Sequence, residues 1–160
     1  MSTLFTDFFV KINQMSPLEH SFTEVLDTIA LTPRLLYFRG EMPKNVSKNG
    51  KSVRPKAVAI VGSRHNTKYG EEVAYRLAYE LAKRGVVVVS GLAYGIDTIA
   101  HRGCLDAGGV TVAVLGTPID KIYPRAHEPV ARQIIKQGGV VISEYAPQHT
   151  QQYQYTWPRG

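Results

Sequence analysis

Four short β-branched runs, separated by segments with helical spacing, constrain the fold of this chain more than any other feature. The runs are AVAIV at 57–61, VVVV at 86–89, VTVAVL at 110–115 and GVVIS at 139–143. Helices are expected between them over 69–84, 96–107 and 127–137, the first with Val73, Leu77, Ala78 and Leu81 on its buried face. This alternation predicts an α/β fold, a parallel sheet with helices on both faces in a three-layer α/β/α arrangement. The continuous AVAIV run further predicts a strand that is buried on both sides.

The residues before the first run divide into two parts. Residues 1–40 are expected to form an N-terminal extension, with a helix over 20–31 that Thr32-Pro33 ends and a short lead-in strand at 35–38. Residues 41–56 contain two prolines, a glycine and several bases, which predicts a basic linker or loop. The core is then expected over 57–160. It stops soon after its fourth strand, so either the sequence is truncated at its C-terminus or a partner completes the sheet.

The charge of the chain is positive and unevenly distributed. Lys and Arg outnumber Asp and Glu by 19 to 13, a net charge of +6. Within 34–68 the only acid is Glu41, and the bases are Arg34, Arg39, Lys44, Lys48, Lys51, Arg54, Lys56, Arg64 and Lys68. This distribution is compatible with a polyanionic partner and equally with a solvated, flexible loop.

The composition also excludes several classes of protein. No apolar run reaches the roughly 18 residues that cross a bilayer, and the N-terminus lacks a signal-peptide pattern, which predicts a cytoplasmic protein without a membrane partner. Cys104 is the only cysteine, so a disulfide framework is excluded and a thiolate-rich metal site is disfavoured. We therefore expect no metal and no cofactor.

The joints that follow the strands are suited to an anion. The first strand ends in Gly62-Ser63-Arg64, the second in Ser90-Gly91 and the third at Gly116. Glycine lets a phosphate approach the backbone, the following helix offers unpaired N–H groups, and an arginine fork matches phosphate geometry. A phosphate site is favoured over purely structural turns. The spacing fits neither the G-x-G-x-x-G fingerprint nor a P-loop, which argues against NAD, FAD and Walker-type nucleotide binding.

Asp97 and His101 are the most suggestive ionisable pair, since residues four apart share a helix face. An acid–base or metal pair is one interpretation. The favoured alternative is structural, with Asp97 capping the helix start and His101 packing against it or bonding to it. No nucleophile, base and orienting acid form a recognisable set, so we predict a binding protein and not an enzyme.

Five segments, taken in order, resemble the DNA-processing protein A family (DprA, also called Smf). They are LTPRLLYFRG at 31–40, AVAIVGSRHNTKYG at 57–70, SGLAYGIDTIAHRGCL at 90–105, TVAVLGTPIDKIYPRAH at 111–127 and GVVISEY at 139–145. The third is the most specific, because it matches a long S-G-x-A-x-G-I-D-x-x-A-H signature.

The resemblance implies an extended Rossmann-like fold that binds single-stranded DNA, protects incoming DNA in natural transformation and hands it to the RecA recombinase, without catalysis. It also implies a possible homodimer. The family's phosphate-contacting arginine corresponds to Arg64, with Gly62 and Ser63 beside it, and Ser90, Gly91 and Gly95 belong to the same pocket. Lys68, Asp97, His101 and Gly116 are candidate supporting residues.

The tail departs from the family pattern. Trp157 stands where the family has a stacking phenylalanine, and Gln154 stands where it has a lysine. The chain ends at Gly160, where the family continues through R-N-R and a further helix. Two alternatives are a small-nucleotide-binding Rossmann-like sensor and an enzyme like the nucleoside-monophosphate phosphoribohydrolases, although the P-G-G-x-G-T loop of those enzymes is absent from this sequence. A third is a degenerate binding module that uses the fold for protein contacts alone.

Overall fold

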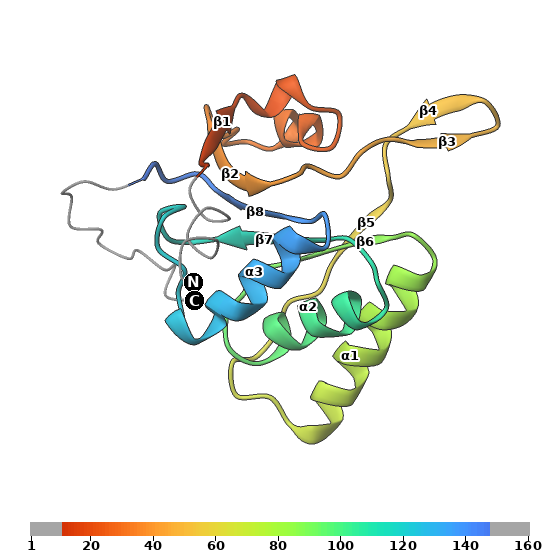
Figure 1. Cartoon of the computed structure of the whole chain (residues 1–160), viewed down its shortest axis with the longest axis vertical. Coiled ribbons are helices and arrows are strands. Elements are labelled where there is room, and N and C mark those ends of the chain that lie inside the picture. Colours follow the sequence, from red (N-terminus) through yellow and green to blue (C-terminus); the bar gives the residue numbers. More distant parts are fainter. Residues whose placement is uncertain (1–10, 148–160) are drawn as a thin grey trace, which may run out of the picture.

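The computed structural model describes residues 11–147, which build one six-stranded sheet, one hairpin and three α-helices (Figure 1). In chain order the elements are β1 (Asn13–Met15), the 3₁₀ helices η2 (Pro17–Glu19) and η3 (Glu24–Thr28), β2 (Leu36–Gly40), β3 (Val46–Lys48), β4 (Lys51–Val53), β5 (Ala57–Ala59), α1 (Lys68–Lys83), β6 (Val87–Ser90), α2 (Ile96–Asp106), β7 (Thr111–Leu115), the 3₁₀ helix η4 (Arg125–His127), α3 (Glu128–Lys136) and β8 (Val140–Ser143). No helix of residues 11–147 is long and apolar enough to cross a membrane.

The large sheet is mixed, with the strand order β1-β2-β8-β7-β6-β5. Strands β5 to β8 run parallel, as the alternation of strands and helices predicts. β2 pairs antiparallel with β8, and β1 pairs antiparallel with β2. The α/β fold class predicted from the sequence is confirmed, and the N-terminal strands make the parallel core part of a mixed sheet.

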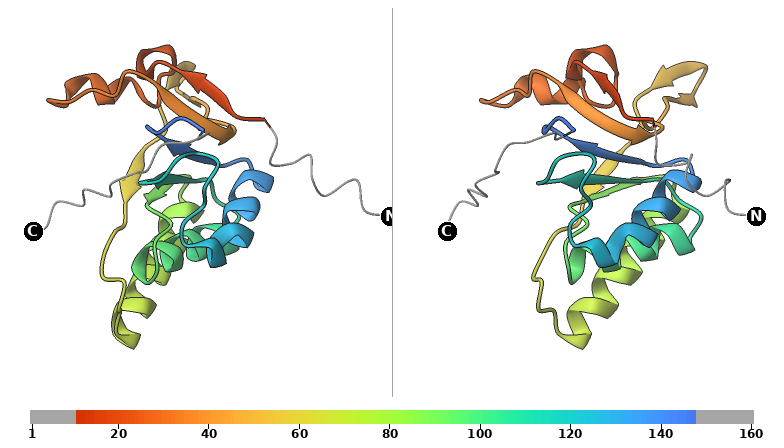
Figure 2. Two further views of the ribbon diagram at one scale, coloured as in Figure 1. Left: turned by 90° about the vertical axis from the view of Figure 1, so that its left-hand side faces the viewer. Right: turned by 60° about the vertical axis from the view of Figure 1, so that its left-hand side comes forward.

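The three α-helices lie on one face of the sheet, and the N-terminal 3₁₀ helices lie on the other (Figures 1 and 2). Each successive strand from β5 to β8 is added on the same side of the one before it. Because a parallel crossover is right-handed, all three connecting helices then fall on the same face. The layer on the opposite face consists of η2 and η3, from whose segment Phe22 packs with Met42 against β-strand valines. Within residues 11–147, the second helical layer of the predicted three-layer arrangement is thus made of 3₁₀ helices and not of α-helices.

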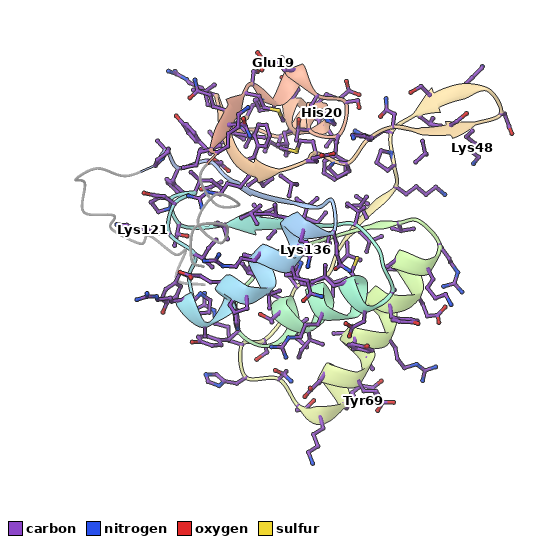
Figure 3. All side chains as sticks on the ribbon, viewed as in Figure 1. Glu19, His20, Lys48, Tyr69, Lys121 and Lys136 are labelled. Atoms are coloured by element: carbon purple, nitrogen blue, oxygen red, sulfur yellow. The ribbon has the colours of Figure 1, made fainter. Side chains whose placement is uncertain are left out.

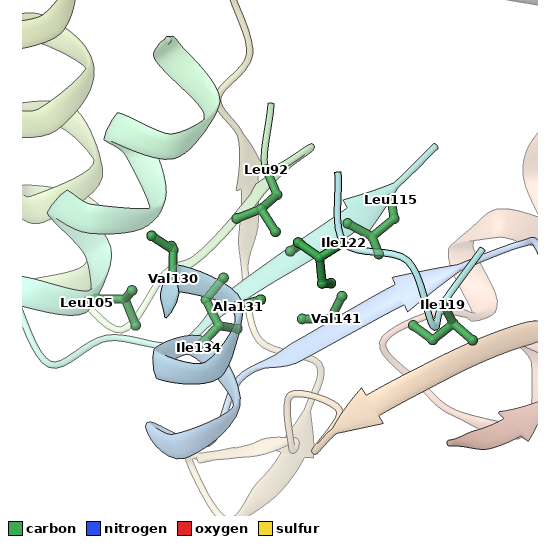
Figure 4. Close-up of a cluster of buried hydrophobic side chains, with 10 residues drawn as sticks. Leu92, Leu105, Leu115, Ile119, Ile122, Val130, Ala131, Ile134 and Val141 are labelled. Atoms are coloured by element: carbon green, nitrogen blue, oxygen red, sulfur yellow. The ribbon is translucent and has the colours of Figure 1, made fainter. Parts of the chain in front are cut away.

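Two apolar clusters fill the space between the helices and the sheet. The larger one joins α3 to β7 and β8, with Ile134, Ala131 and Val141 at its centre (Figure 4). The second joins α1 and α2 to β5 and β6, and it contains mostly small side chains, among them Ala78 and Ala100. Leu92 is fully buried in the larger cluster although its φ of 58° is positive.

Small residues allow α1 and α2 to approach closely. Gly103 of α2 faces the backbone of Tyr75 in α1, where an added Cβ would lie 2.5 Å from the carbonyl oxygen. The buried face of α1 is accordingly Ala74, Ala78 and Ala82. The predicted face was correct in part: Ala78 is fully buried and Leu81 packs against the same cluster, whereas Val73 and Leu77 are 43% and 47% exposed.

Strand β5 lies at the outer edge of the described sheet, hydrogen-bonded to β6. Ala57, Val58 and Ala59 are all exposed, and Val61 is 70% exposed. The prediction that this run is buried on both faces was therefore wrong. The β-branched composition is typical of a strand, but it does not distinguish a central strand from an edge strand.

The predicted helix over 20–31 is also absent, since this segment forms 3₁₀ turns. Thr23 and Thr28 donate their hydroxyls to the carbonyls of Pro17 and Val25, at 2.7 and 2.8 Å. Such local bonds compete with the α-helical pattern. Val25 and Ile29 are 44% and 47% exposed, so this segment does not bury the apolar face on which the helix prediction rested.

Residues 41–56, predicted as a loop or linker, contain the β3–β4 hairpin. Asn49 and Gly50 form its two-residue turn, both with positive φ (51° and 71°), as expected for an Asn-Gly hairpin turn. The preceding strand β2 belongs to the same sheet as β5 to β8. The division of the chain at residues 40 and 56 stays a prediction.

Candidate functional site

A pocket of about 310 Å³ lies at the carboxyl ends of β6 and β7, beside the turn that follows β5. In sheets of this kind, ligands bind outside these strand ends. The pocket is lined by Arg64, Gly91, Ala93, Tyr94, Asp97, Val114, Gly116, Thr117, Tyr123 and Pro124. Three of the residues predicted for the binding site, Arg64, Gly91 and Gly95, meet here, since Gly95 packs against the backbone of Arg64.

The turn after β5 presents Arg64 to the pocket. Ser63 shapes the turn, because its Oγ accepts a hydrogen bond from the His65 N–H at 3.0 Å. Gly62 leaves room for Ile96 of α2, since a Cβ at Gly62 would fall 2.8 Å from that side chain. Gly62 and Ser63 thus determine the shape and packing of the turn that carries Arg64, and neither of them lines the pocket.

Gly95 locks this turn to the one after β6. Its φ is 77°, and an added Cβ would lie 2.9 Å from the backbone of Arg64 and overlap the Ser63 carbonyl. The N–H of Ile96 donates to that same Ser63 carbonyl at 3.2 Å. The position of Arg64 therefore depends on a glycine in the neighbouring turn.

Asp97 is part of the pocket wall, but its role differs from the predicted cap. Its carboxylate accepts a hydrogen bond from the Gly91 N–H at 3.2 Å, whereas the N-cap position of α2 is Gly95 and no side chain caps it. This N–H is therefore engaged by a carboxylate. A Cβ at Gly91 would lie 2.7 Å from a carboxylate oxygen of Asp97, so this glycine leaves room for the contact.

Ser90 and His101 lie below the pocket. Ser90 is 3% exposed and donates its hydroxyl to the Ile60 carbonyl at 2.6 Å, which ties β6 to the end of β5. His101 is fully buried and contacts Thr111 at 2.8 Å, not Asp97 as one prediction had it. The Thr111 hydroxyl donates to the Val88 carbonyl, so the His101 Nδ1 must be the donor to Thr111. Both side chains are buried and hydrogen-bonded within the protein, and neither lines the pocket.

Burial lowers the pKa of His101 to about 3, and its neighbour His127 adds to the shift. The unfolded chain takes up this proton near pH 6.5, whereas the folded chain does so only near its much lower pKa. Stability from His101 is thus complete above pH 6.5 and is lost as the pH falls toward 3. Between pH 7 and pH 5 we expect a loss of about 2 kcal/mol in unfolding free energy from this group. Urea unfolding at the two pH values measures it.

The His101→Gln variant is the control for this pH dependence. It lacks the imidazole, so its stability should fall by about 2 kcal/mol less than that of the parent over the same pH interval. The comparison uses the pH dependence and not the absolute stability, which the substitution changes by itself. Equal pH dependence in parent and variant would contradict the assignment.

Two tyrosines form an aromatic rim that the sequence reasoning missed. Tyr94 and Tyr123 are 49% and 60% exposed and both line the pocket. Tyr94 lies edge-on to His127 with ring centroids 4.9 Å apart. The His127 Nδ1–H donates to the Leu92 carbonyl at 2.8 Å, so the ring that orients Tyr94 also holds the turn. Tyr94 lies in the segment S-G-L-A-Y-G and Tyr123 in D-K-I-Y-P, so their place next to the strand-end joints was the sequence signal that could have identified them.

The remaining predicted residues lie in three places. Gly116 lines the pocket with no heavy atom within 4 Å of where a Cβ would be, so it leaves the floor open. Lys68 begins α1 and borders a different hollow, with Glu71 and Arg102. Trp157 lies outside the described residues.

The basic residues of 41–56 do not contribute to this pocket. Their hairpin precedes the start of β5, whereas Arg64 follows its end (Figure 1). The site thus combines one guanidinium, two aromatic rings and one carboxylate around an open floor. Such a set can hold a phosphate beside a flat ring.

The model of the family described as DNA recombination-mediator protein A matches residues 13–159. The putative DNA processing protein DprA of Mycobacterium tuberculosis is 53% identical over 95 residues, which are 59% of this chain and 24% of that protein. The chain thus spans only about a quarter of that curated relative.

Two solved structures share the fold. One gives insight into the unique single-stranded DNA binding mode of DNA processing protein A from Helicobacter pylori, with a TM-score of 0.70 and 29% identity over 88% of this chain and 58% of that one. The other is DNA processing protein A from Streptococcus pneumoniae, with a TM-score of 0.68 and 34% identity over 89% of this chain and 47% of that one. With the family model covering nearly the whole sequence, the chain belongs to the DNA recombination-mediator protein A family.

Proposed function

We propose that this chain binds single-stranded DNA, with a backbone phosphate at Arg64 and bases against Tyr94 and Tyr123. The observation that carries the proposal is the pocket itself, which gathers a guanidinium and two exposed phenol rings at the carboxyl edge of the sheet. Single-strand binding proteins combine cationic groups that follow the backbone with aromatic rings on which bases stack. A relative of the same fold has been studied for its single-stranded DNA binding mode.

The charges that line the pocket are expected to fix the orientation of a bound nucleotide. The Asp97 carboxylate on the pocket wall repels a phosphate, whereas Arg64 attracts it. A bound nucleotide is therefore expected to place its phosphate toward Arg64 and its base toward the tyrosine rings. The hydrogen bonds of Leu92, Ala93 and Asp97 fix the turn before any ligand arrives, which lowers the entropic cost of binding.

The wider role rests on the family resemblance. It suggests a cytoplasmic, non-catalytic protein that protects incoming DNA and loads the RecA recombinase, with a homodimer as the suggested assembly. A binding role without catalysis is further supported by the two best acid–base candidates, since Asp97 and His101 are engaged in structural hydrogen bonds.

Replacing Arg64 with alanine is expected to weaken binding to every single-stranded sequence by roughly 10- to 100-fold. A hydrogen bond to a charged group contributes about 1.5–3 kcal/mol, and this one is lost. The log–log salt dependence should become shallower by about 0.7, the value for one released counterion on a single strand. Fluorescence anisotropy with labelled oligonucleotides over a salt series measures both quantities.

Arg76→Ala is the matched control, because Arg76 is exposed on α1 and does not line the pocket. It removes the same charge and should leave affinity nearly unchanged. Arg64→Ala binding like the parent would refute the proposal. Tight binding of AMP with release of its base would instead favour a nucleotide hydrolase, and tight binding without release a nucleotide sensor.

A further inference from the structure

The β3–β4 hairpin is an arm that stands out from the body of the protein (Figures 1 and 3). Residues 44–54 are all exposed, whereas Met42, Pro43 and Pro55 at its two bases are buried. These buried residues anchor the arm on both sides. The Asn49-Gly50 turn sets a fixed register between its strands.

The register separates the side chains of the arm onto two faces. Val46 lies opposite Val53, and Lys48 lies opposite Lys51, while Ser47 and Ser52 face the other way. One face therefore carries two lysines next to the turn and two half-exposed valines nearer the body. The other face carries only hydroxyls from its paired residues.

The lysine pair is unfavourable in the free protein. Like charges directly opposite each other on a two-stranded ribbon destabilise it, because their Cβ atoms are only about 5 Å apart. Glu41, the one acid of residues 41–56, forms an ion pair with Lys44 at 2.9 Å. Among residues 11–147, neither Lys48 nor Lys51 forms an ion pair. A partner rich in negative charge would relieve this repulsion.

We propose that this face of the hairpin is a second contact for the DNA backbone, at the opposite end of β5 from the pocket. Lys48 and Lys51 bind successive phosphates, and Val46 and Val53 contact sugars or bases. Arg54 and Lys56 continue the positive charge toward β5. Since the same strand is held in the pocket, the inference rests on the proposed function and extends it to longer DNA.

The distance between the two contacts defines the test. Arg64 follows Lys51 by thirteen positions, so the Cα atoms of these two residues are at most about 47 Å apart, even for a fully extended chain. An oligothymidylate of about 6 nucleotides is of the size that fills one site, whereas one of about 30 nucleotides has the length to reach both. Anisotropy titrations with the two lengths separate pocket binding from hairpin binding.

The double variant Lys48→Gln and Lys51→Gln is expected to weaken binding of the long oligonucleotide only. Its log–log salt slope should be shallower by about 1.4, so the parent's advantage is about sevenfold larger near 50 mM than near 200 mM salt. Lys48→Arg with Lys51→Arg retains the charge and should bind like the parent. Lys83→Gln with Lys136→Gln removes the same charge from the ends of α1 and α3 and should leave the slope unchanged.

Two results would overturn the inference. One is an unchanged affinity and slope of the Lys48→Gln, Lys51→Gln variant on the long oligonucleotide, which would leave an acidic protein surface as the alternative partner. The other is an equal loss on the short oligonucleotide, which would indicate an effect of net charge. If Arg64→Ala leaves the short oligonucleotide unaffected while the hairpin variant still weakens the long one, the proposed pocket fails and the hairpin contact stands.

Discussion

The Gly95→Ala variant is expected to lose more than about 3 kcal/mol of unfolding free energy and most of its affinity for single-stranded DNA. Gly95 has φ 77° and ψ −130°, a backbone conformation that glycine adopts readily but that strains an alanine by roughly 1–3 kcal/mol. The added Cβ would also overlap the backbone of Ser63 and Arg64. The turn after β5 must move to relieve this overlap. Because that turn carries Arg64, stability and binding should be lost together.

Gly108→Ala is the control for a positive φ without a steric overlap. Gly108 follows the other end of α2 with a φ of 73°, and nothing lies within 4 Å of where its Cβ would be. It should lose only about 1–2 kcal/mol and keep its DNA affinity. Urea unfolding and anisotropy on both variants give the comparison. Equal stability losses at the two glycines would mean that the two turns are not in tight contact.

The Gly103→Ala variant should also be strongly destabilised, by about 3 kcal/mol, although alanine normally stabilises a helix. In an unobstructed helix the change from glycine gains roughly 0.5–1 kcal/mol. At Gly103 the added Cβ would lie 2.5 Å from the Tyr75 carbonyl oxygen, so α1 and α2 would have to separate. The steric term is expected to exceed the helix propensity and reverse the sign.

Gly70→Ala gives the opposite expectation on α1. The nearest atoms to a Cβ there are at 3.5 and 3.6 Å, an ordinary contact distance. Its stability should rise slightly, as propensity alone predicts. Thermal unfolding of both variants measures this contrast. A Gly103→Ala protein as stable as Gly70→Ala would show that the two helices can accommodate a methyl group at their crossing.

The order of strands and helices could be predicted from the sequence because periodicity and glycine joints are local signals. The positions of these elements in the sheet could not. AVAIV has the composition of a central strand, yet β5 lies at the edge of the described sheet. Likewise Val73 and Leu77 have helical spacing, but the close contact at Gly103 selects alanines for the buried face of α1. Both outcomes depend on which elements meet in three dimensions.

The location of the candidate site could be predicted from local signals in the sequence, but the side chains that line it could not. Strand-end joints identify the right edge of the sheet, and the structure places Arg64 there. The local sequence does not show which side chains turn inward. Ser90 lies beneath the pocket and Gly91 donates its N–H to Asp97, whereas Tyr94 and Tyr123 form the rim. Whether these residues bind DNA stays a proposal.

The edge position of β5 has a consequence for the dynamics of the site. The ladder of this three-residue strand to β6 joins Ala57, Val58 and Ala59 to Val87, Val88 and Val89. In the part of the chain that the structure describes, β5 is paired on one side only. Such a strand opens more readily by local fluctuation than a strand in the middle of a sheet, and its amides exchange with solvent sooner. Arg64 lies five residues after the end of this strand. A ligand that immobilises Arg64 would therefore slow hydrogen exchange along β5, so occupancy of the pocket and the rigidity of the sheet edge are thermodynamically linked.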